Sequence, residues 1–136
     1  MIKTGLEINN LTNFRVDKKF LKEIAEKTLS LTKFEIPEMS IVLVCDARMK
    51  NLNKRYKDKN RVTDVLAFDY GEVIICLSQA KRQAKELRHS LKKELGILLI
   101  HGILHLAGYK DQTKQQRERM TKRQDNIFLK IKNSPR

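Results

Sequence analysis

The chain has 136 residues and a mass of 16.0 kDa, which suits one domain and excludes a repeat array or a multidomain machine. Its 40% hydrophobic and 33% charged residues are typical of a globular protein rather than a disordered or fibrous one. The 29 basic and 16 acidic residues give a net charge of +13, which favours a polyanion or an anionic surface as the usual partner.

The first half of the chain predicts two strands and two helices. Residues 6–9 are extended, and apolar residues recur at helical spacing over 20–31, after Asp17, which can cap that helix. Residues 41–45 form an unbroken run rich in β-branched side chains, as in a strand covered on both faces. Asp46 can cap the next helix, which has a narrow apolar line and an outward basic face.

The second half predicts a hairpin and three helices. The apolar runs 65–68 and 73–76 are joined through Gly71 and should pair antiparallel. Ser78 and Ser90 can cap helices over 79–88 and 91–106, and Gly108 can end the second of them. A last helix is expected over about 114–132, and residues 133–136 should fray. The order predicts a single α+β domain over residues 1–136, with a mixed four-stranded sheet and about five helices.

The cysteines and the apolar segments indicate the compartment. Cys45 and Cys76 are too few for a disulfide framework, so we expect two buried thiols in a reducing, cytoplasmic setting. We find no export signal, and the most apolar window, 95–108, is shorter than the ~20 residues that span a bilayer. No membrane partner is expected.

Positive charge is concentrated in three segments. Residues 48–61 hold seven basic and one acidic side chains, 81–93 six and one, and 110–136 nine and three. Lysine-rich helix faces can serve solubility alone, but three basic segments flanking two apolar, mildly acidic ones favour a phosphate backbone as the partner. In the first segment we expect the contacts to come from Arg48, Lys50, Lys54, Arg55, Lys59 and Arg61.

His101 and His105 are the candidate metal ligands. Their spacing of four places both imidazoles on one helix face, one turn apart. Asp111 follows Gly108 closely enough to fold back as a third ligand, and two histidines with a carboxylate and an open position form a catalytic zinc pattern. Two helical histidines can also be packed without metal. The zinc-protease pattern fails, because Gly102 stands where that chemistry needs a glutamate.

Residues 101–109, H-G-I-L-H-L-A-G-Y, resemble the signature H-G-x-L-H-L-x-G-Y-D-H of the bacterial YbeY family. Residues 52–57 (L-N-K-R-Y-K) resemble the family's L-N-x-x-Y-R, residues 63–68 (T-D-V-L-A-F) its T-D-V-L-S-F, and residues 71–76 (G-E-V-I-I-C) its G-D-I-x-I-C. The resemblance covers at least residues 40–120. It implies a metal-dependent endoribonuclease that acts on single-stranded RNA in ribosomal RNA maturation and ribosome quality control.

The chain departs from the family pattern at two functional positions. Asp111 replaces the third histidine ligand; it can still bind one zinc ion per chain, but could admit other divalent metals. The family's functional arginine falls on Lys57, which keeps the charge but loses the bidentate fork. The resemblance implies that Lys57 is a catalytic residue that steadies the scissile phosphate.

A second hypothesis is a ribosome-assembly factor that binds RNA and has weak or lost nuclease activity. Both hypotheses make RNA the partner, in the form of ribosomal RNA or the ribosome, and both leave the oligomeric state open. Glu94 is a weaker candidate for supporting the metal ligands, since a favourable charge in the first helical turn is its simpler role. His89 is expected to be an exposed loop histidine.

Overall fold

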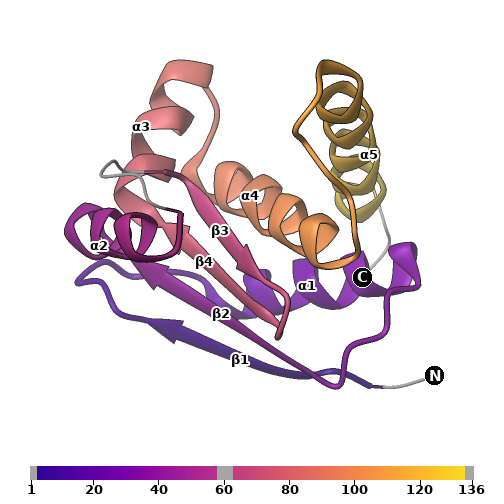
Figure 1. The fold of residues 1–136 in the computed structure, drawn as a ribbon, viewed down its shortest axis with the longest axis horizontal. Helices are drawn as coiled ribbons and strands as arrows, with labels where there is room; N and C mark the ends of the chain where they lie inside the picture. Colours follow the sequence, from indigo (N-terminus) through magenta and orange to yellow (C-terminus); the bar gives the residue numbers. More distant parts are fainter. Residues whose placement is uncertain (1–2, 58–62, 134–136) are drawn as a thin grey trace.

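A computed structural model describes residues 3–57 and 63–133. In chain order the described elements are β1 (Gly5–Asn10), α1 (Lys18–Thr32), β2 (Glu38–Val44), α2 (Asp46–Lys57), β3 (Val65–Phe68), β4 (Glu72–Cys76), α3 (Leu77–Leu87), α4 (Leu91–Leu106) and α5 (Lys114–Lys132) (Figure 1). Residues 134–136 of the tail that we expected to fray lie outside this description.

The strands form one mixed sheet in the order β1-β2-β4-β3. β2 pairs parallel with both β1 and β4, whereas β3 pairs antiparallel with β4 through the predicted hairpin. The hairpin turn needs glycine, because Gly71 has a φ of +104° and an added Cβ would lie 2.6 Å from the carbonyl oxygen of Glu38. The four-stranded α+β fold predicted from the sequence is confirmed.

Side chains alternate between two apolar clusters on opposite faces of the sheet. Val73 and Ile75 of β4 point into the main core with α1 and α4, while Ile74 packs with Met49 of α2 on the other face. Residues 41–44 of β2 contribute to both clusters, as expected of a strand covered on both faces. α4 lies between α3 and α5 and also packs on α1, β3 and β4, so the most apolar helix is at the centre of the molecule (Figure 1).

Two helices begin at their predicted caps. Asp17 accepts a hydrogen bond from the Phe20 N–H at 3.0 Å, and Ser90 accepts one from the Lys93 N–H at 3.0 Å. The Ser78 prediction is wrong: α3 begins at Leu77, and Ser78 Oγ instead accepts the N–H of Asp46 at 3.0 Å. A tertiary partner has replaced the local one.

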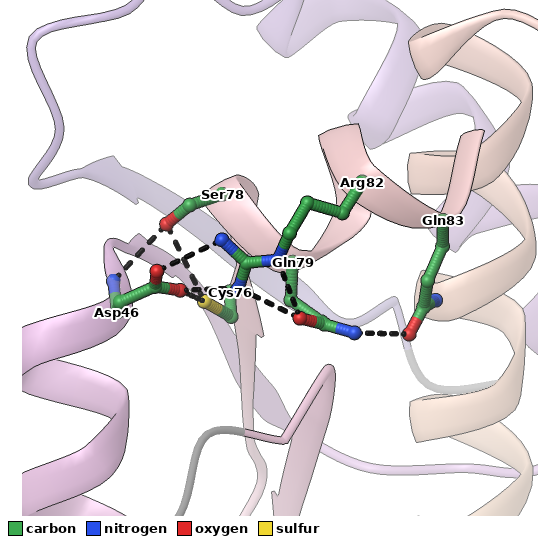
Figure 2. Close-up of polar contacts among 6 residues, drawn as sticks. All are labelled: Asp46, Cys76, Ser78, Gln79, Arg82 and Gln83. Atoms are coloured by element: carbon green, nitrogen blue, oxygen red, sulfur yellow. Dashed lines mark hydrogen bonds and ion pairs between the residues drawn. The ribbon is translucent and has the colours of Figure 1, made fainter. Parts of the chain in front are cut away.

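Asp46 also serves a different partner from the one expected. It is the first residue of α2, and its carboxylate accepts two hydrogen bonds from Arg82 of α3, at 2.8 and 2.9 Å (Figure 2). The Arg82 hydrogen bonds lower the pKa of Asp46 to about 2. The Cys76 thiol donates to the same carboxylate at 3.3 Å and is buried as predicted, whereas Cys45 is only half-buried.

Within the described residues, none of the helices combines the length and the apolar character that a membrane crossing requires.

Candidate metal centre

α4 brings the two histidines to the surface from its largely buried later turns. His101 and His105 keep 27% and 28% of their side chains exposed, while the adjacent Ile100, Ile103 and Leu104 are fully buried. Gly102 permits this packing, because an added Cβ would lie 2.5 Å from a methyl carbon of Val73 in β4. The helix can thus approach the sheet closely without turning its histidines inward.

The end of α4 directs the chain back toward the histidines. Gly108 has a φ of +102°, and its N–H donates to the His105 carbonyl at 3.1 Å. The Tyr109 N–H donates to the Leu104 carbonyl at 3.0 Å, which completes a Schellman motif. The helix therefore ends at the glycine that we expected to end it, and Asp111 comes to lie beside the two imidazoles.

Three potential ligand atoms converge at this point. His105 Nε2 lies 3.1 Å from His101 Nε2 and 3.2 Å from Asp111 Oδ2, and His101 Nε2 lies 3.8 Å from the same carboxylate oxygen. Ligands about 2.0–2.1 Å from a tetrahedral zinc ion lie about 3.3–3.4 Å from one another. The donor set and its spacing therefore fit one such ion, with room for a further ligand.

Gln124 of α5 fixes the orientation of His101. Its Oε1 lies 2.9 Å from His101 Nδ1, and since an amide oxygen can only accept, Nδ1 carries the proton and Nε2 keeps its lone pair. Burial, reinforced by the neighbouring His105, lowers the pKa of His101 below its ordinary value. Both effects hold His101 in the neutral tautomer that a metal ligand requires.

The cluster faces a cavity of about 570 Å³. The cavity is lined by the three candidate ligands, by Asn53 of α2 and by residues of β3 and its flanks, Asp64 among them. Sequence reasoning missed Gln124 and Asp64. Asp64 is part of the T-D-V-L-A-F segment, residues 63–68, but the sequence predicted no role for it. Gln124 lies 23 residues from His101, on a helix whose apolar pattern gives no sign of the contact.

The predicted phosphate-binding residues fall on α2 and beyond it. Arg48, Lys50, Lys54 and Arg55 are exposed on the helix, as expected for its basic face. Lys59 and Arg61 lie outside the described residues. Lys57 is the last residue of α2, and its side chain also lies outside the description. The helix that carries Lys57 contributes Asn53 to the cavity over the cluster.

His89 and Glu94 differ from expectation. His89 is partly buried rather than exposed, and its Nε2 lies 2.7 Å from Oε1 of Glu94, whose side chain is only 4% exposed. Glu94 does lie in the first turn of α4, but it is buried and paired instead of solvated. The apolar pattern of the helix gave no sign that this carboxylate points inward.

Comparisons with known proteins agree with this geometry. The family model described as "Endoribonuclease YbeY" matches residues 7–132. A protein named Endoribonuclease YbeY from a Sulfurihydrogenibium species is 41% identical over 85% of this chain and 84% of its own length. One of the same name from Phytoplasma australiense is 35% identical over 93% of this chain and 94% of its own. The solution structure of TM1509 from Thermotoga maritima matches with a TM-score of 0.66 and 30% identity, covering 93% of this chain and 88% of that one.

Proposed function

The chain belongs to the YbeY family, and on that premise we propose that it is a metal-dependent endoribonuclease that hydrolyses phosphodiester bonds of single-stranded RNA. The observation that carries the proposal is the convergence of His101 Nε2, His105 Nε2 and Asp111 Oδ2 within 4.8 Å of one another at the edge of a polar cavity. Three ligands on an accessible face are typical of a catalytic site, since a structural zinc site closes with four.

His101, His105 and Asp111 would hold the ion, and zinc is the metal that their donor atoms favour. A bound divalent ion supplies a Lewis acid for a phosphoryl oxygen and lowers the pKa of a coordinated water toward ~7. The protein's part is to hold the three ligand atoms together, to keep His101 in its neutral tautomer, and to position the RNA backbone. We assign the last task to Lys57 together with the exposed cations of α2.

The biological substrate that we propose is ribosomal RNA, in its maturation and in ribosome quality control, within the cytoplasm. The YbeY family membership and the net charge of +13 support this assignment. The whole chain would act as a single endoribonuclease domain, since the family model spans residues 7–132 of its 136 residues.

An RNA-binding assembly factor with weak nuclease activity is the second candidate. Two sequence departures favour it: Asp111 stands where the family pattern has a histidine, and Lys57 where it has an arginine. An anionic ligand makes the ion less electrophilic, and a lysine contacts a phosphate as a point charge rather than as a fork. This candidate keeps all the basic residues and their RNA contacts.

Cleavage of single-stranded RNA, measured together with metal content, separates the two candidates. The nuclease requires that activity disappear on chelation and return with about one ion per chain. Lys57→Ala should lower cleavage by about tenfold or more without changing the melting temperature, and Lys57→Arg should match or exceed the parent. Lys50→Ala, on the same helix, is the matched control and should affect RNA affinity alone. Equal cleavage by the parent and Lys57→Ala would favour the assembly factor.

A further inference from the structure

A second hollow adjoins the metal cluster. It has a volume of about 540 Å³ and lies among α3, α4 and α5. Its lining includes Leu87, His89, Lys93, Ile97, Leu98 and Gln124. It shares Asp64 and His101 with the cavity over the ligands, so an RNA strand held at the cluster can extend directly into it.

A buried carboxylate supports one wall of this hollow. Glu94 Oε1 pairs with His89 Nε2 at 2.7 Å, and Glu94 Oε2 accepts a hydrogen bond from Gln83 Nε2 at 2.7 Å. Gln83 is itself held, since its Oε1 accepts from Gln79 Nε2 at 3.1 Å (Figure 2). Burying a carboxylate is costly unless its oxygens are paired, and here both are. The His89 ring is therefore fixed in place by side chains of α3 and α4.

The fixed ring presents a ring nitrogen without a partner. With Nε2 held by Glu94, His89 Nδ1 has no partner among the described residues and can form a hydrogen bond with a ligand. Gln124 presents hydrogen-bond donors, because its Oε1 serves His101 and its amide N–H groups are unpartnered in the described part of the chain. The hollow thus offers a ring nitrogen from the loop between α3 and α4 and amide donors from α5.

The remaining lining is mostly apolar or acidic. Leu87, which is 61% exposed, provides apolar surface together with Ile97 and Leu98. Among the described residues of the lining, Asp64 and Asp125 outnumber the one cation, Lys93, so these residues disfavour a phosphate. A neutral, flat group with donors and acceptors along its edge fits these features best, and the volume lies in the range of small-ligand sites.

We propose that this hollow is a nucleobase subsite, which receives the base of the nucleotide next to the scissile phosphate of a single-stranded RNA. The proposal rests on the proposed function, since the strand must cross the metal cluster. His89 Nδ1 would form a hydrogen bond with the base, Gln124 would donate to it, and Leu87 with Ile97 would pack on its face. Glu94 is a positioning residue that holds the His89 ring in place.

A series of RNA oligonucleotides tests the subsite, each carrying one abasic nucleotide at a successive position. Binding is measured by fluorescence anisotropy, with the metal-free and the zinc-loaded protein. For the parent we expect one position at which loss of the base weakens binding by about tenfold, the effect of one stacked and hydrogen-bonded base. His89→Ala and Leu87→Ser should abolish that dependence while still binding RNA. Lys85→Ala, exposed on α3 outside the lining, is the matched control and should retain it.

The outcomes separate the subsite from the nuclease. Equal binding of all abasic oligonucleotides by the parent, or an unchanged positional dependence in both His89→Ala and Leu87→Ser, overturns the subsite. Leu87→Ser removes only an exposed side chain, so the test holds even if His89→Ala fails to fold. A protein that shows the base dependence but cleaves no RNA would refute the nuclease and keep the subsite. A protein that cleaves RNA but shows no base dependence would refute the subsite and keep the nuclease.

Discussion

At the scale of single residues, Gln124 is the contact that the structure adds to the predicted metal ligands. It accepts from His101 Nδ1 and so leaves Nε2 free for the ion. Gln124→Leu should weaken zinc affinity by about 10–100-fold, the usual cost of losing a partner that orients a metal-bound histidine. Gln124→Glu retains an acceptor and should bind zinc at least as tightly as the parent. A competition titration with a chromogenic chelator measures both.

The control for Gln124 is Asn126→Leu, which removes an amide from the exposed side of the same helix. It should leave zinc affinity unchanged. Equal zinc affinities for the parent and Gln124→Leu would show that the contact does not orient His101.

The lowered pKa of His101 predicts that the stability of the metal-free protein depends on pH. Because burial lowers its pKa in the folded state below the ordinary 6.5, the folded state binds fewer protons than the unfolded one at acidic pH. Its contribution to stability is complete above about pH 6.5 and is lost as the pH falls through the lowered value. The midpoint of denaturation should therefore be lower at about pH 5.5 than at about pH 7.5. This decrease should be smaller in His101→Gln. The same decrease in both proteins would assign the effect to other groups.

At the scale of the elements, the approach of α4 to the sheet depends on one missing side chain. In Gly102→Ala the new Cβ would meet Val73, a buried and β-branched residue, so we expect a loss of about 1–3 kcal/mol in the free energy of unfolding. Adding Val73→Ala makes room for the new Cβ. The double variant should therefore be more stable than the sum of the two single losses in the free energy of unfolding predicts. Urea unfolding of the single and double variants measures this coupling.

Gly108→Ala provides a comparison. Its cost comes from a φ of +102° and not from crowding, since an added Cβ meets nothing within 4 Å. The losses in the free energy of unfolding caused by Val73→Ala and Gly108→Ala should therefore add without coupling. If the losses caused by Val73→Ala and Gly102→Ala also added, this would contradict the close approach of α4 to β4.

Local sequence signals predicted the elements well where the partner is local. Asp17, Ser90 and Gly108 act on residues within one turn of themselves, and all three perform the predicted role. Ser78 and Asp46 also have side chains that can cap, but their partners are distant in sequence: Ser78 Oγ accepts the Asp46 N–H, and the Asp46 carboxylate accepts from Arg82. A cap can be read from the sequence only when no tertiary partner competes for it.

At the scale of the whole molecule, the distribution of charge predicts how RNA binds. The segments 48–61, 81–93 and 110–136 are expected to line one groove near the histidines. Exchange of Lys54 and Arg55 for Glu should weaken single-stranded RNA binding for every sequence tested. It should also make the slope of log affinity against log salt shallower by about 1.4, if each residue contacts one phosphate.

The matched control for the salt experiment changes the same amount of charge elsewhere. Lys3 and Lys33 line a separate pocket that shares no residue with the two cavities at the cluster. Their exchange for Glu should preserve the salt slope of the parent. If both double variants alter the slope equally, net charge alone accounts for RNA binding and the groove is refuted.

The part of the candidate site that could be predicted lies on one helix and on the few residues that follow it. The spacing of His101 and His105, and the glycine stop before Asp111, were enough to bring the three together. Gln124 and the pair of His89 with Glu94 could not be predicted, because they depend on how α3 and α5 pack against α4. Packing between helices is set by the whole core and not by any short motif.

The central claim is that His101, His105 and Asp111 form one divalent metal site, and a calorimetric titration of the metal-free protein with zinc tests it most directly. We expect one ion per chain for the parent, no measurable binding for His105→Ala, and for Asp111→Ala an affinity reduced by about 100-fold, at least the cost of losing a supporting contact. Asp111→His should restore tight binding. Binding by Asp111→Ala as tight as that of the parent would contradict the account.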